Sequence, residues 1–118
     1  MKVEDWLTQA RRDLSTAKYL LEGRRYKEAS LFSQQTAEKS LKALLLKISQ
    51  EIIKTHDLIK LGRLVSLPKE YEADCEGLSM VYIDARYPDT SKEDYTKTEA
   101  QKDINIAMEI LRWVENQI

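Results

Sequence analysis

The chain has 118 residues, with 19 basic and 20 acidic side chains, so an overall field that attracts nucleic acid or acidic membranes is excluded and a single domain over residues 1–118 is expected. It contains 3 glycines and 2 prolines, which disfavours a fold built on tight turns and favours long helices. Because the lone Cys75 cannot form an intramolecular disulfide and no apolar run reaches the roughly 20 residues of a membrane span, we expect a cytoplasmic protein.

Two amphipathic helices are predicted in the first half of the chain. Apolar residues recur at steps of three and four between Val3 and Leu21, and Gly23 follows just past the end of this series. After a short connection, a second series runs between Ala29 and Ile48 and keeps one face throughout. This second helix is expected to be the longest.

A short third helix is expected after the long one. Residues 49–55 lose the helical period, which indicates a connection. Thr55 is a plausible N-cap for the helix, with Asp57 in its first turn. The apolar residues of this helix are three leucines at helical spacing: Leu58, Leu61 and Leu64.

Two further helices complete the expected fold. The pattern resumes between Tyr71 and Ala85 and stops before Pro88, because the residue that precedes a proline disfavours a helical backbone. Thr96 and Glu99 form a capping box after a polar loop, and the last helix runs from there to the C-terminus. We therefore predict an all-α protein, an up-and-down antiparallel bundle of four long helices plus one short helix.

The last helix carries a second apolar stripe besides the one that would face the core. It consists of Ile106, Ile110 and Trp113. A helix packed on one side only would not need this stripe. Either the helix is central in the bundle or another subunit covers the stripe, and the sequence leaves both possibilities open.

Gln35, Glu38 and Lys42 share one face of the second predicted helix, away from its apolar stripe. They are either a solvated face or part of a binding site. In the first case the Glu38–Lys42 pair, at i and i+4, would contribute only a few tenths of a kcal/mol.

His56 is the only histidine of the chain, which excludes a histidine-rich metal site. The spacings Glu-x-x-His and Cys-x-x-Cys are also absent, so we predict no metal and no cofactor. His56 is either a plain helix-start residue beside Thr55 or a group that contacts phosphate or exchanges a proton near neutral pH.

The stretch between Tyr82 and Asp89 gathers a cation, phenols and an acid at one predicted helix end. The planar fork of Arg86 suits a phosphate group, and the ring of Tyr87 could stack on a base. The alternative is local: Arg86 could interact with the last carbonyls of its helix and pair with Asp89.

Three segments occur in an order and spacing typical of one family. They are residues 33–44 (SQQTAEKSLKAL), 56–58 (HDL) and 85–89 (ARYPD). Together they resemble the HEPN domain family (higher eukaryotes and prokaryotes nucleotide-binding), in its small stand-alone prokaryotic form, over nearly the whole chain. The resemblance implies a helical bundle and a homodimer with a groove between protomers, often paired with a separate small nucleotidyltransferase.

Many HEPN proteins are metal-independent ribonucleases that use an arginine followed a few residues later by a histidine, often with a tyrosine two positions beyond. Arg86 matches the arginine, but Glu93 stands at the histidine position and Tyr95 at that of the tyrosine. Glutamate is ionised near neutrality and repelled by a phosphodiester, so it replaces imidazole poorly. Only a fold that brings His56 beside Arg86 could restore the missing group.

The leading hypothesis is therefore a non-catalytic module that binds a nucleotide or RNA, forms a homodimer and works with a small nucleotidyltransferase in a toxin–antitoxin-like pair. Arg86 and Lys42 would meet phosphate, and Tyr87 would stack. One alternative is a ribonuclease toxin in which His56 and Arg86 are catalytic; another is a purely structural helical partner. The predicted binding residues are Gln35, Glu38, Lys42, His56, Arg86, Tyr87 and Asp89.

Overall fold

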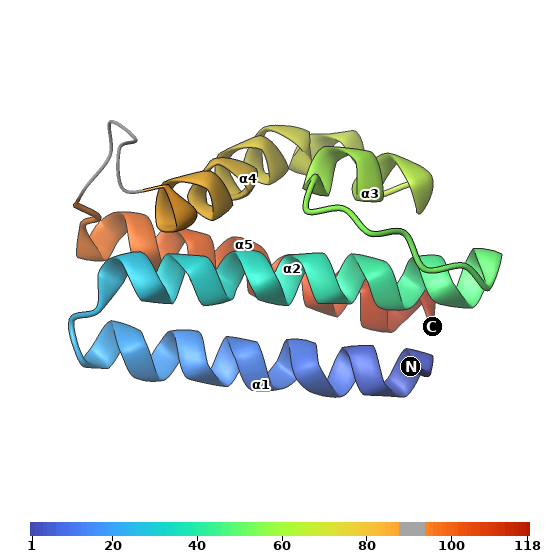
Figure 1. Cartoon of the computed structure of the whole chain (residues 1–118), viewed down its shortest axis with the longest axis horizontal. Coiled ribbons are helices and arrows are strands. Elements are labelled where there is room, and N and C mark those ends of the chain that lie inside the picture. Colours follow the sequence, from blue (N-terminus) through green and yellow to red (C-terminus); the bar gives the residue numbers. More distant parts are fainter. Residues whose placement is uncertain (88–93) are drawn as a thin grey trace.

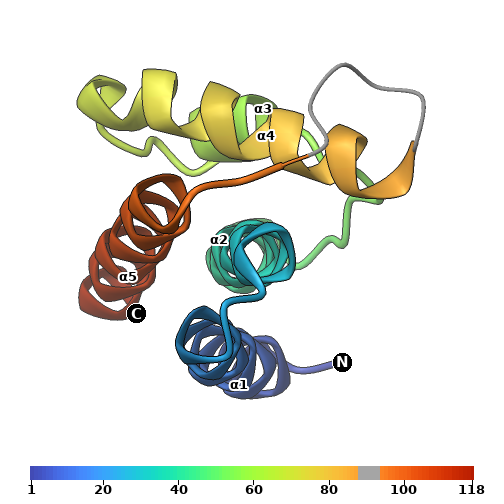
Figure 2. The same ribbon diagram turned by 90° about the vertical axis from the view of Figure 1, so that its left-hand side faces the viewer.

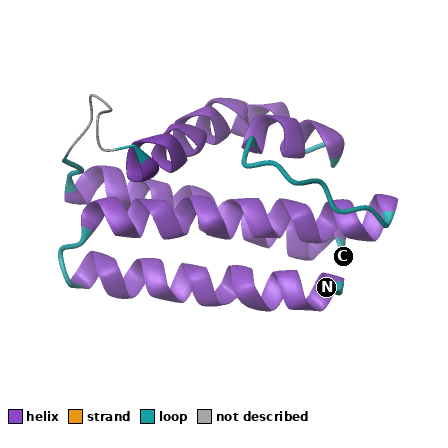
Figure 3. Cartoon of the chain, viewed as in Figure 1, coloured by secondary structure: helices purple, strands orange, loops and turns teal. Residues whose placement is uncertain are grey.

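The computed structural model describes residues 1–87 and 94–118, and within these ranges every regular element is helical (Figure 3). The prediction of four long helices and one short helix in an all-α fold is confirmed, and a single 3₁₀ turn is added before the fourth helix. The elements are α1 (Val3–Glu22), α2 (Tyr26–Ser49), α3 (Leu58–Leu64), η1 (Lys69–Tyr71), α4 (Glu72–Arg86) and α5 (Lys97–Gln117).

Helix α2 is the centre of the bundle. It packs against α1, α5, α4 and α3, and most of its residues are buried. The successive long helices alternate in direction (Figure 1). Figure 2 shows α1, α2 and α5 nearly end-on but α4 from the side, so α4 lies across α2 instead of alongside it. Because α4 crosses over α2, the end of α4 comes close to the connection between α2 and α3.

The helix ends follow local capping chemistry, with one correction. Gly23 ends α1, and Thr96 with Glu99 forms the predicted capping box of α5. The N-cap of α3 is Asp57 and not Thr55: an Asp57 carboxylate oxygen accepts hydrogen bonds from the backbone amides of Ile59 (3.0 Å) and Lys60 (3.2 Å). A carboxylate that reaches two free amides caps a helix better than a single hydroxyl does.

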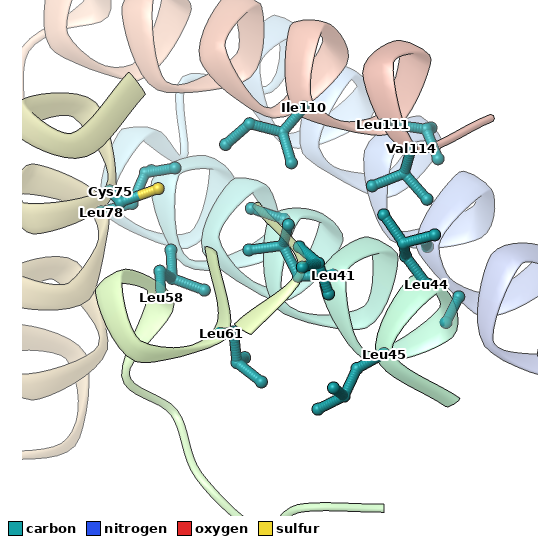
Figure 4. Packing of buried hydrophobic residues seen from close by; sticks show 14 of the residues in the cluster. Leu41, Leu44, Leu45, Leu58, Leu61, Cys75, Leu78, Ile110, Leu111 and Val114 are labelled. Atoms are coloured by element: carbon teal, nitrogen blue, oxygen red, sulfur yellow. The ribbon is translucent and has the colours of Figure 1, made fainter. Parts of the chain in front are cut away.

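Helices α1 to α5 all contribute to the core. Figure 4 shows side chains of α3, α4 and α5 pointing toward Leu41 of α2, which is fully buried. The second stripe of α5 contributes to this core, because Ile110 is fully buried, Ile106 is 7% exposed and Trp113 packs partly buried against it. The chain itself therefore covers most of this stripe, which no longer argues for a second subunit. None of the described helices is apolar over a length that would cross a membrane.

Cys75 of α4 lies in this core with 1% of its surface exposed. Burial, with a smaller contribution from the charges of Asp74 and Glu72, raises the pKa of its thiol from the ordinary 9.0 to about 11. The folded chain therefore holds this proton more tightly than the unfolded chain does.

The resulting stabilisation is complete below pH 9 and is lost as pH rises toward 11. We expect the free energy of unfolding, measured by urea denaturation, to fall by roughly 2 kcal/mol from this group over that range. Cys75→Ala is the control, because it removes the cysteine contribution and leaves every other titrating group in place. Equal pH dependence in the two proteins would contradict the prediction.

Candidate functional site

Glu38 is the buried acceptor at the centre of a polar cluster on α2. It is 4% exposed and accepts hydrogen bonds from Lys42 Nζ (3.1 Å), Gln34 Nε2 (3.1 Å) and His56 Nδ1 (2.7 Å). The partly buried Gln35 donates to Gln34 Oε1 at 2.6 Å. A solvated face is therefore wrong for Glu38 and Lys42, because helix α1 and the connection after α2 cover them.

Lys42 lies between this carboxylate and an aromatic ring of α1. Its side chain is 10% exposed, and Nζ lies 5.7 Å from the centre of the Trp6 ring. The indole face and the carboxylate of Glu38 together stabilise the buried ammonium. Lys42 thus balances the charge of Glu38 within the fold.

His56 comes from the connection between α2 and α3, one residue before the Asp57 cap. Because the carboxylate of Glu38 accepts at Nδ1, that nitrogen carries a proton and Nε2 is the acceptor in the neutral ring. No described residue forms a hydrogen bond with Nε2, and the side chain is 47% exposed. His56 therefore presents an oriented nitrogen to solvent.

The Tyr82 ring contacts both His56 and Arg86. The His56 and Tyr82 rings are stacked, with centroids 4.1 Å apart and an interplanar angle of 20°. Arg86, one helical turn further along α4, places Cζ 4.5 Å from the centre of the same Tyr82 ring. We call Glu38, Lys42, His56, Tyr82 and Arg86 the α2–α4 site. The fold thus places the Tyr82 ring in contact with both His56 and Arg86.

The end of α4 presents two exposed side chains. Arg86 pairs with no carboxylate of a described residue, and Tyr87 is 57% exposed. The predicted partner Asp89 lies outside the described residues, as does Glu93. Since Lys42 and Arg86 are two cations against the single carboxylate of Glu38, the α2–α4 site is cationic whatever the protonation of His56.

Tyr95, at the position of the family's tyrosine, lies in the interface between α4 and α5. Its hydroxyl donates a hydrogen bond to Asp84 Oδ2 at 2.9 Å, and the residue is 9% exposed. Burial, followed by this hydrogen bond, raises the pKa of Tyr95 above its ordinary value. The hydroxyl ties the start of α5 to α4 and stays protonated at neutral pH.

Sequence reasoning missed two members of this arrangement, Gln34 and Tyr82, as site residues. Each lies four positions before a residue that was predicted, Glu38 and Arg86 respectively, and so shares its helix face. That spacing is the signal that could have identified both.

Three cavities lie away from His56, Tyr82 and Arg86. A cavity of about 410 Å³ adjoins α3, and cavities of about 270 and 620 Å³ adjoin α4 and α5. None of these three is lined by His56, Tyr82 or Arg86. The exposed guanidinium of Arg86 beside aromatic side chains suits an anion that also carries a base.

Comparison with known proteins gives one consistent result. The family model of the HEPN domain matches residues 3–117. The crystal structure of an archaeal HEPN homologue is 37% identical, with 99% of this chain and 98% of that chain covered and a TM-score of 0.84. The crystal structure of a protein from Thermus thermophilus is 31% identical, with 98% of each chain covered and a TM-score of 0.90. Among curated proteins, none matches.

Proposed function

The chain belongs to the HEPN domain family, and we propose that it binds the phosphate groups of a nucleotide or of RNA at the α2–α4 site. The observation that carries this proposal is the state of Arg86: its guanidinium is held on the ring of Tyr82, is exposed, and has no carboxylate partner among the described residues. A planar cation held in this way matches a phosphate group.

The burial of each side chain suggests its role. Arg86 contacts phosphate, His56 Nε2 offers a second polar contact, and Tyr87 stacks on a base. Lys42, at 9% exposed, is assigned to neutralising Glu38 instead of contacting the ligand directly. Gln35 and Asp89 are candidates for hydrogen bonds to the polar edges of a base in the ligand.

The proposal includes a homodimer formed through one face of α4. Met80 and Ile83 are 51% and 41% exposed, and their spacing places them on one side of the helix, next to Arg86. A second copy that covers this apolar face would place two α2–α4 sites beside one groove. A monomeric mass in light scattering at every concentration would remove this part of the proposal.

The partner in this proposal is a small separate nucleotidyltransferase in a toxin–antitoxin-like pair. This step rests on the family resemblance, because many HEPN proteins work with such an enzyme. Co-purification of the chain with the product of a neighbouring nucleotidyltransferase gene tests it, and a genome without such a neighbour would count against it.

Binding is tested with nucleoside mono-, di- and triphosphates and a short single-stranded RNA, by calorimetry or fluorescence anisotropy. We expect Arg86→Ala to weaken binding about tenfold, because a charge-assisted contact to phosphate is lost. The matched control is Arg112→Ala, an exposed arginine on α5, which should bind as the wild type does. If no ligand binds the wild type, or if both variants bind equally, the phosphate site is wrong and a structural role is left.

A second candidate function, ribonuclease activity, is favoured by one specific observation. The buried carboxylate of Glu38 holds His56 Nδ1 at 2.7 Å and leaves Nε2 toward solvent, which is the arrangement of an oriented acid–base group. Tyr82 links this group to Arg86, which could stabilise charge on a phosphate. His56 would then supply the imidazole that Glu93 does not.

A further inference from the structure

The cavity of about 410 Å³ beside α3 is separate from the α2–α4 site. It is enclosed by α3, the turn that follows it, η1 and the first turns of α4. Its walls are mainly apolar, and they include Leu58, Ile59, Leu67, Pro68 and Cys75. Pockets that bind small molecules have volumes of about 300–1,000 Å³, so this cavity is large enough for one.

The turn after α3 forms a fixed wall of the cavity. The Leu67 amide donates a hydrogen bond to the Gly62 carbonyl at 2.8 Å, and Ser66 adopts a left-handed backbone with φ 60°. A Cβ at position 62 would lie 3.1 Å from Leu67 Cδ2, so the glycine allows Leu67 to close against α3. The cavity is therefore bounded by ordered backbone.

The charges of the cavity lie at its rim. Arg63 of α3 forms an ion pair with Glu72 of α4 across the mouth. Lys69 is exposed, and no described residue pairs with it. Arg63 and Lys69 are the basic residues that line the cavity and Glu72 is the acidic one, whereas the interior is apolar and contains the neutral thiol of Cys75.

We propose that this cavity binds a small amphipathic carboxylate, with its apolar body against Leu58, Leu67 and Cys75 and its carboxylate beside Lys69. Apolar walls favour burial of a hydrocarbon, and the unpaired ammonium favours an acidic end group over a neutral or basic one. The site shares no residue with the α2–α4 site, so it stands or fails independently of nucleotide binding.

Octanoate is the probe, and 1-octanol is its neutral match. In ¹H–¹⁵N NMR titrations of the full chain, octanoate is expected to shift the amide signals of Leu58, Gly62 and Cys75. We expect 1-octanol to bind about two- to fivefold more weakly, the range that one exposed ion pair contributes. Lys69→Glu should weaken octanoate binding by at least the same factor. The matched control is Lys60→Glu, an exposed lysine of α3 that does not line the cavity.

Two results would overturn the proposal. If neither compound shifts these signals while the spectrum shows a folded chain, the cavity is not a ligand site. If octanoate and octanol bind equally, or Lys69→Glu behaves as Lys60→Glu does, the carboxylate specificity is wrong. Both variants change exposed side chains, so their folding should be preserved.

Discussion

Replacing Glu38 with alanine is expected to lower the free energy of unfolding by about 3 kcal/mol, because it leaves a buried ammonium without its carboxylate. The side chains of Glu38 and Lys42 are 5% and 10% exposed, so water does not replace the lost contact without a rearrangement. The Trp6 ring, 5.7 Å from Lys42 Nζ, stays in place, but a cation–π contact contributes only about 0.5–2 kcal/mol. Urea denaturation measures the difference.

The control for this prediction removes both charges at once. Glu38→Leu combined with Lys42→Met keeps most of the buried volume, and we expect its stability to lie within about 1 kcal/mol of the wild type. Because His56 and Gln34 lose their acceptor in both proteins, the difference between them reports the unpaired Lys42 together with the smaller side chain at position 38. If Glu38→Ala alone is as stable as the wild type, the ammonium reaches solvent and the description of a buried pair is wrong.

The helices could be predicted from the sequence because their signals are local. A period of three and four residues marks an apolar face, and a pair such as Thr96 and Glu99 marks a helix start within one turn. The wrong prediction of the α3 N-cap is also a local matter, decided within one turn of the helix. Thr55 and Asp57 are both acceptable cap residues, and only the direction of the chain decides which one reaches the free amides.

The environment of Glu38 could not be predicted, because the same spacing fits two situations. Residues at i, i+3 and i+7 share a helix face whether that face meets water or another segment. What decides between them is the path of the connection that carries His56 and the angle at which α4 crosses α2 (Figure 2). Both are long-range features of packing, and a central helix buries its polar face as well as its apolar one.

The stack of His56 on Tyr82 has the same origin. Each residue lies near a helix end, and nothing in the sequence near either one indicates the other. The contact exists because α4 ends beside the start of α3. The resemblance to a family singles out His56 and Arg86, whereas the fold determines that Tyr82 contacts both.

On the ribonuclease candidate, cleavage of RNA by the purified chain is expected to fall by roughly 10²- to 10⁴-fold in His56→Ala. In this reaction His56 Nε2 takes the proton of a ribose 2′-hydroxyl, whose oxygen then attacks the adjacent phosphorus. The bond to the 5′-oxygen breaks, and that oxygen takes up a proton, which gives a 2′,3′-cyclic phosphate and a 5′-hydroxyl. Arg86 stabilises the charge that develops on the phosphate oxygens.

Variants of His56 and Arg86 distinguish cleavage of RNA from binding of RNA. His56→Ala keeps Arg86 and Tyr82, so it should still bind RNA, whereas Arg86→Ala should weaken binding about tenfold and also lose cleavage. Tyr82→Phe is the matched control, because it keeps the ring that contacts His56 and Arg86. A chelator should not change the rate if the reaction needs no metal. If the wild type binds RNA without cutting it, or if His56→Ala cuts at the wild-type rate, His56 is not the acid–base group. Glu38 then orients a histidine that only holds its ligand.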